Sequence, residues 1–208
     1  MTNKNKYMAK KILFALAILI HSSAFAQDKL TKDIDFDGKN DTVYINQNEG
    51  KIVCRLSSQN FKKTKSQPIE TSSDHSYIKA TRNGFELRNN WMRSGYASQF
   101  RYDKLEKRIR LIGFSEYAFG NAANDGSGEA SANLLSGDYI GNWNYYDHLA
   151  NNEKGELVKI PTIKAKLKFR RIYLEDFNEE SYYSYSTQLE GIVEKHKIAE
   201  QKRRSKGK

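Results

Sequence analysis

The segment that decides the fold is Tyr77-Ile-Lys-Ala-Thr-Arg-Asn-Gly-Phe-Glu-Leu-Arg-Asn-Asn-Trp91, in which two short runs flank an Asn-Gly pair. An Asn-Gly pair between such runs is the strongest short-range signal for a β-hairpin. We therefore predict strands at Tyr77–Thr81 and Phe85–Trp91, joined by a turn at Asn83-Gly84.

Runs of the same kind continue on both sides of this hairpin, with turn residues between them and no helical periodicity. The pattern predicts a mainly β fold over residues 27–177, an antiparallel sandwich or barrel. The further strands are predicted at Thr42–Gln47, Lys51–Ser58, Tyr96–Tyr102, Arg108–Phe119, Ala130–Leu135, Tyr139–Tyr146, Leu157–Phe169 and Ile172–Leu174.

The pattern changes at residue 178, and residues 178–208 are predicted to form a C-terminal α-helix with a basic tail. Asn178 precedes two acids that favour the positive end of a helix dipole. Apolar and aromatic residues then recur every three or four positions. We expect the helix to reach about Lys197 and Gln201–Lys208 to be frayed. The recurring residues are Tyr182, Tyr185, Leu189, Ile192 and Val193.

The distribution of charge excludes a nucleic-acid partner. The net charge of the 208 residues is +10. Four lysines and no acid lie in residues 1–26, and seven basic residues and one acid lie in residues 195–208, which together account for all of that charge. The part between is electrically balanced, so no basic face is expected on the folded domain.

Residues 1–26 have the order of a secretory signal peptide. Lysines precede nine uninterrupted apolar residues, Ile12–Ile20, and the segment closes with Ala24-Phe25-Ala26. An apolar run this short does not cross a bilayer, so we expect cleavage after Ala26 and a periplasmic or secreted protein that is not embedded in the membrane. Cys54, which alternates with apolar residues on a predicted strand, is expected to be buried.

The segment Asp33-Ile-Asp-Phe-Asp-Gly-Lys-Asn-Asp41 predicts a calcium site. Its carboxylates occupy relative positions 1, 3, 5 and 9, with glycine at 6, which is the spacing that wraps oxygen ligands around a hard cation. Tyr44 stands where an EF-hand would have glutamate, so the loop leads into a strand. We predict a structural Ca²⁺ held by Asp33, Asp35, Asp37, the Lys39 carbonyl and Asp41.

Three segments of the chain together resemble a group of exported β-proteins. They are the calcium-type loop, Arg110-Leu-Ile-Gly113 and Ser131-Ala-Asn-Leu-Leu-Ser-Gly137. That group includes calcium-loop immunity proteins that block lysozyme-like effectors, is similar in fold to periplasmic lysozyme inhibitors, and includes uncharacterised secreted proteins of Bacteroides-type bacteria. The inhibitors often present an S-G-x-x-Y loop, and Ser136-Gly-Asp-Tyr139 is one residue shorter. The resemblance implies a non-catalytic inhibitor or immunity protein whose partner is a lysozyme-like enzyme.

The glycine- and asparagine-rich segment Phe119–Glu129 and the aromatic strand after it predict a binding surface. The aromatic side chains on that strand fit either a hydrophobic core or a recognition face that stacks on a sugar or enters a partner. The binding residues predicted there are Asn121, Asn124, Asp125, Glu129, Tyr139, Trp143 and Tyr145.

The sequence favours a binding protein over an enzyme, because no zinc-hydrolase or nucleophile-elbow spacing is present. The alternative is an exported carbohydrate- or peptidoglycan-directed enzyme that uses Glu116, Asp125 or Glu129, or a module that binds an envelope glycan. A glycosidase would need two of these carboxylates about 5–10 Å apart across a concave site.

Overall fold

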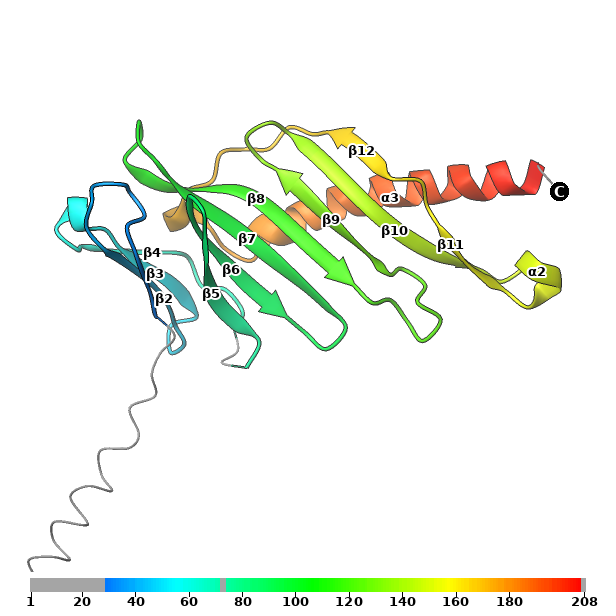
Figure 1. Cartoon of the computed structure of the whole chain (residues 1–208), viewed down its shortest axis with the longest axis horizontal. Coiled ribbons are helices and arrows are strands. Elements are labelled where there is room, and N and C mark those ends of the chain that lie inside the picture. Colours follow the sequence, from blue (N-terminus) through cyan, green and yellow to red (C-terminus); the bar gives the residue numbers. More distant parts are fainter. Residues whose placement is uncertain (1–28, 72–73, 207–208) are drawn as a thin grey trace, which may run out of the picture.

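The computed structural model describes residues 29–71 and 74–206, which form two antiparallel sheets and one long C-terminal helix (Figure 1). The prediction of a mainly β fold with a C-terminal helix is confirmed, and neither sheet closes into a barrel. The predicted signal peptide, residues 1–26, lies outside the described residues. No helix within the described ranges has the length and apolar character needed to cross a membrane.

The small sheet carries the N-terminal loop and has four strands in chain order, including two short edge strands that the sequence did not predict. Its inner residues alternate with outer ones, as at Val43 and Ile45, because successive side chains of a strand point to opposite faces. Cys54 is buried in this sheet, as predicted. The strands are β1 (Lys29–Lys32), β2 (Asp41–Asn46), β3 (Lys51–Arg55) and β4 (Lys63–Lys65).

The large sheet is an antiparallel meander in which each strand from β5 to β11 pairs with the next. The long strand β10 pairs along its other edge with β11 near one end and β12 near the other. The strands are β5 (Ser76–Thr81), β6 (Gly84–Asn90), β7 (Ser94–Asp103), β8 (Arg108–Ala118), β9 (Gly128–Asn133), β10 (Asp138–Asp147), β11 (Glu156–Lys159) and β12 (Ile163–Lys166).

The prediction of a single strand at Leu157–Phe169 is wrong, because this segment is divided into β11 and β12. Pro161 lies between them and has no N–H to donate to a strand ladder. The predicted strand Ile172–Leu174 is reduced to one bridge between Tyr173 and Arg110. A 3₁₀ turn, η2 (Leu174–Asp176), follows it, and an unpredicted turn labelled α2 (Ala150–Glu153) joins β10 to β11.

The β5–β6 hairpin is present, but Gly84 has another role than the one predicted. Thr81 pairs with Gly84, so the turn consists of Arg82 and Asn83. A Cβ atom on Gly84 would lie 2.1 Å from the carbonyl oxygen of Phe100 on β7. Glycine is therefore required at this position by the close approach of two strands.

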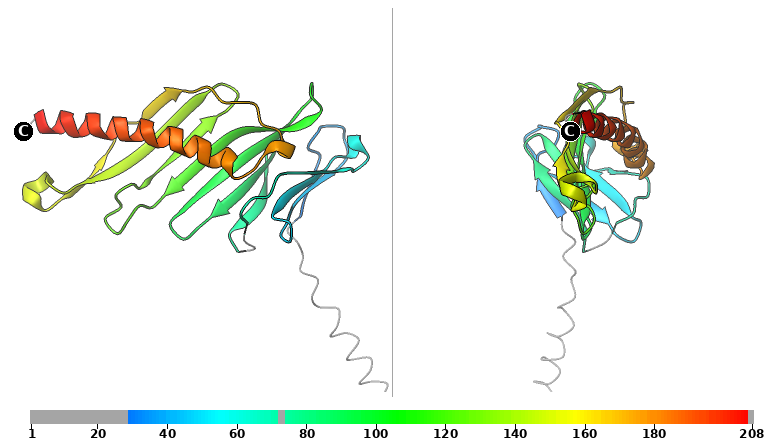
Figure 2. Two further views of the ribbon diagram at one scale, coloured as in Figure 1. Left: turned by 180° about the vertical axis from the view of Figure 1, so that it is seen from behind. Right: turned by 90° about the vertical axis from the view of Figure 1, so that its right-hand side faces the viewer.

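The helix α3 (Glu180–Lys206) covers one face of the large sheet, as the two opposite views in Figures 1 and 2 show. Asn178 caps it, since its Oδ1 accepts a hydrogen bond of 3.0 Å from the Ser181 N–H. Tyr185 packs against Phe114 of β8, with ring centroids 4.9 Å apart. The predicted stripe is thus the face that meets the sheet.

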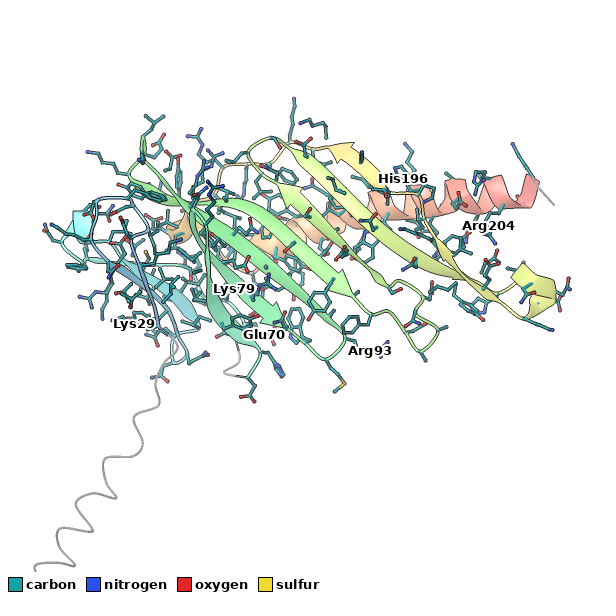
Figure 3. All side chains as sticks on the ribbon, in the orientation of Figure 1. Lys29, Glu70, Lys79, Arg93, His196 and Arg204 are labelled. Atoms are coloured by element: carbon teal, nitrogen blue, oxygen red, sulfur yellow. The ribbon has the colours of Figure 1, made fainter. Side chains whose placement is uncertain are left out.

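The prediction of a frayed tail from Gln201 is wrong, because the helix continues to Lys206. The Arg203 guanidinium donates to Glu200 at 2.7 and 2.8 Å within the helix. Arg204 donates to Glu156 of β11 at 3.0 Å, which attaches this end of the helix to the sheet edge (Figure 3). These ion pairs hold the basic segment in helical form.

Candidate functional site

The carboxylates of Asp33, Asp35 and Asp37 gather in the predicted calcium loop, with one oxygen of each lying within 4.8 Å of the others. Gly38 has φ of +85°, the left-handed conformation that the sharp reversal of such a loop requires. Asp33 accepts backbone hydrogen bonds from Phe36, at 2.8 Å, and from Gly38, at 3.0 Å. The local fold therefore brings three oxygen ligands of the type that Ca²⁺ prefers to one place.

Asp41 stands apart from these three carboxylates. It is fully buried, and its Oδ2 accepts the N–H groups of Ile34, at 2.7 Å, and Asp35, at 3.2 Å. Its Oδ1 accepts the N–H of Ser57 at 2.7 Å. Asp41 thus closes the loop onto β2 and β3. The Lys39 carbonyl stays a predicted ligand of the ion.

Two serines that the sequence reasoning missed contact the gathered carboxylates. They belong to η1 (Ser57–Gln59), which follows β3. Ser57 Oγ donates to Asp37 Oδ2 at 2.8 Å, and Ser58 Oγ donates to Asp35 Oδ2. The Ser57 hydroxyl and the Lys39 N–H hold the pKa of Asp37 below its usual value because both stabilise the charged form.

The predicted recognition loop is braced by Arg93 rather than free to adapt. Arg93 Nε donates to the Gly120 carbonyl at 2.8 Å, and its Nη2 donates to the Asn121 carbonyl at 3.0 Å (Figure 3). The Asn121 side chain accepts the N–H of Asp125 at 3.1 Å, and Asp125 accepts the N–H of Tyr146 at 2.9 Å. Asn121 and Asp125 therefore fix the loop; Asp125 is half-buried, and Asn121, Asn124 and Glu129 are exposed.

The aromatic strand is resolved in favour of the core, so the prediction that Tyr139 and Tyr145 form a binding face is wrong. Both side chains are about 1% exposed, because the face of β10 that carries them is the one covered by α3. Trp143 shares this face and is partly buried, and its Nε1–H donates to Tyr139 Oη at 3.1 Å. Gly141 makes room for this contact, since a Cβ there would lie 2.5 Å from Tyr139 Oη.

The other face of the large sheet carries a shallow groove that the sequence reasoning did not find. The signal was available, because polar residues alternate with buried ones along β9 and β10. Tyr117, Glu129 and Asn142 are neighbours across three strands and therefore share this face. The groove has a volume of about 380 Å³, and its polar lining includes Arg88, Asn90, Ser115, Tyr117, Glu129, Ser131 and Asn142.

Hydrogen bonds orient the groove side chains before any ligand arrives. Tyr117 Oη donates to Asn90 Oδ1 at 3.3 Å, and the amide of Asn90 donates to Tyr77 Oη at 3.4 Å. Arg88 Nε donates to Glu86 Oε1 at 2.6 Å, which neutralises a largely buried carboxylate. The groove therefore presents hydroxyl, amide and ring surfaces in a fixed arrangement.

The three carboxylates of the predicted enzyme are divided between the two faces. Glu116 accepts a hydrogen bond of 3.0 Å from the Tyr182 hydroxyl of α3, so its side chain lies on the covered face. Burial raises the pKa of Glu116, and the nearby Glu190 raises it further, against the effect of the Tyr182 hydrogen bond. Asp125 lines a cavity on the covered face together with Glu116, whereas Glu129 lies in the groove of the uncovered face.

Cys54 fits the structural role that was predicted. Its thiol is buried in the small sheet, and burial raises its pKa well above the usual value. A thiol held in its neutral form is a poor nucleophile.

No protein-family model, curated protein or solved structure matches the chain.

Proposed function

We propose that the protein is an exported, non-catalytic binding protein of the cell envelope that recognises its partner through the uncovered face of the large sheet. The observation that carries the proposal is the polar groove on that face, whose side chains are already oriented by hydrogen bonds. Binding sites of this kind hold few but fixed polar groups.

The chemistry of the groove favours binding over turnover. Glu129 is the exposed carboxylate in it, and the arginine there is engaged by Glu86 at 2.6 Å. A glycosidase of the usual type needs an acid and a second carboxylate facing the same bond. Glu116 has its carboxylate on the other side of the sheet, where it lines a cavity with Asp125; the Tyr182 hydroxyl donates to Glu116, and the Tyr146 N–H donates to Asp125.

A lysozyme-like enzyme is the proposed partner, in keeping with the resemblance of this chain to the group of exported β-proteins. The proposal makes this protein an inhibitor or immunity protein, and its entry into the envelope rests on the secretory pattern of residues 1–26. Tyrosine and arginine on a mixed polar surface are typical of protein interfaces that form and dissociate.

The test is inhibition of peptidoglycan lysis by lysozymes of different types. Tyr117→Ala is expected to weaken inhibition at least about tenfold, since an aromatic anchor is typically worth more than 1.4 kcal/mol. Tyr183→Ala is the control, because Tyr183 is an exposed tyrosine on α3, which lies on the other face of the sheet. Inhibition that survives Tyr117→Ala would place the interface elsewhere, and lack of inhibition of every lysozyme would reject this partner.

An envelope glycan is the second candidate, favoured by the amides, hydroxyls and tyrosine rings of the groove. Such groups bond to sugar hydroxyls and pack against sugar rings. Calorimetric titration with soluble peptidoglycan fragments separates the candidates. Saturable heat that Tyr117→Ala removes would favour the glycan, and its absence would leave the protein partner.

Structural Ca²⁺ in the loop of residues 33–41 is also part of the proposal, supported by the gathered carboxylates of Asp33, Asp35 and Asp37. The ion would tie the loop to the small sheet and offset the repulsion among the acids. Millimolar calcium is expected to raise the melting temperature relative to chelator, because a ligand that binds the folded state stabilises it. Asp35→Asn with Asp37→Asn should abolish the increase, and no increase in the unaltered protein would reject the ion.

A further inference from the structure

A second cavity lies between α3 and β10, on the covered face of the large sheet and away from the proposed recognition groove. Its volume is about 390 Å³, which is within the usual size range of small-molecule sites. Part of its wall is apolar and aromatic, from Trp143, Ile160, Leu189 and Val193. The cavity therefore has the concave, half-apolar character of a ligand site.

The cavity has an excess of acidic groups, since four carboxylates and one ammonium line it. They are Glu116, Asp125, Glu190, Glu194 and Lys197. Lys197 is already paired, because its Nζ lies 3.7 Å from Glu194 Oε2. Among the described residues, Glu190 has no cationic partner, and it lies close enough to Glu116 to raise the pKa of that carboxyl.

Two aromatic side chains add features that a plain acidic cluster lacks. The Trp143 ring is held in place by its hydrogen bond of 3.1 Å to Tyr139 and lines the cavity beside the carboxylates. Tyr145 lines the same cavity and is 1% exposed, so it adds a second aromatic side chain to the wall.

We propose that this cavity binds an organic cation, a protonated or quaternary amine with a small apolar body. The carboxylates would supply the countercharge, and the Trp143 ring would supply a cation–π contact, for which an indole is the best aromatic partner. The apolar wall would take the body of the ligand. A bare metal ion fits less well, because it needs oxygen on all sides and gains nothing from apolar walls.

The test uses the Trp91→Phe variant, which leaves Trp143 as the single tryptophan and therefore the single indole reporter. Choline is titrated and compared with 3,3-dimethylbutan-1-ol, its uncharged isostere. A saturable change in Trp143 fluorescence with choline and none with the alcohol is expected. An equal response to both compounds, or no response to choline at tens of millimolar, would overturn the proposal.

Charge-neutral variants then locate the site. Replacing both Glu190 and Glu194 by Gln is expected to weaken choline binding by about tenfold, since two exposed charge contacts are lost and the cation–π contact remains. Glu180→Gln is the matched control, because it removes an exposed carboxylate of the same helix outside the cavity. Equal affinity of the double variant and the control would overturn the assignment to this cavity. The measurement is independent of lysozyme inhibition, so either proposal can fail alone.

Discussion

The two faces of the large sheet are built from the same strands and differ in what lies against them. On β9, Ala130 and Ala132 are buried under α3, whereas Glu129 and Ser131 point to the uncovered side. On β10, Tyr139 is buried, and its neighbour Ile140 is 45% exposed. Adjacent residues of one strand thus lie in different environments, one in the core and one at the surface, because successive side chains point to opposite faces.

The difference teaches that aromatic content alone does not identify a binding surface. The face with more large rings is the core, and the face with tyrosine, amides and hydroxyls is the one left open to a partner. A sheet with one covered face commonly leaves the other in water. Substitutions on the two faces should therefore affect different properties.

The largest expected effect comes from Tyr139→Ala on the covered face. Removing a fully buried ring should lower the free energy of unfolding by about 3–5 kcal/mol, measured by urea denaturation. Tyr117→Ala on the uncovered face should cost less than about 1 kcal/mol, because that ring is only partly buried. Equal losses in the two variants would erase the distinction between the faces.

Gly141→Ala should have the next largest effect, again on the covered face. The new Cβ would lie 2.5 Å from Tyr139 Oη and 2.9 Å from Trp143 Nε1, so the rings must shift. Overpacking of this kind costs about 1–3 kcal/mol. Gly191→Ala on α3 is the control, since nothing lies within 4 Å of its added Cβ, and it should stabilise the helix by about 0.5–1 kcal/mol. An unchanged midpoint for Gly141→Ala would mean that the rings are loosely packed.

Glu116→Gln should change how stability depends on pH. Burial raises the folded-state pKa of Glu116 above the ordinary value of 4.5, so its stabilising contribution is complete below that value and is lost as pH rises through the raised pKa. The unaltered protein should therefore lose stability relative to Glu116→Gln as the pH rises above about 4.5 and through the raised pKa, as followed by denaturation midpoints. Parallel profiles for Glu116→Gln and the unaltered protein would contradict the burial of this charge.

The smallest effect is expected for Arg204→Ala, at the far end of the covering helix. The Arg204–Glu156 pair spans 3.0 Å, with side chains 28% and 48% exposed, so its loss should cost about 0.2–1 kcal/mol. Faster amide hydrogen exchange is expected in the last two turns of α3, with no change near Tyr185. Faster exchange along the whole helix would show that this ion pair stabilises all of α3 and not only its last two turns.

The hairpins, the helix start and the gathering of Asp33, Asp35 and Asp37 could be read from the sequence because each depends on residues close together in the chain. Asn178 caps the helix that follows it, and Gly38 turns the loop that contains it. Short strands β1 and β4 gave no comparable signal, since three or four residues are too few for a period to be recognised. Ser57 and Ser58 were missed for another reason, because they contact Asp37 and Asp35 from 20 and 23 positions away in the chain.

The sequence by itself determined that this chain is mainly β, that residues 178 onward form a helix, and which side chains alternate on each strand. Only the tertiary structure decided which of the two alternating sets is buried, because that depends on the face against which α3 packs. Tyr139 and Tyr145 lie under the helix, and Tyr117 and Asn142 lie in the open groove. Periodicity assigns residues to two faces, and burial follows from contacts between segments distant in the chain.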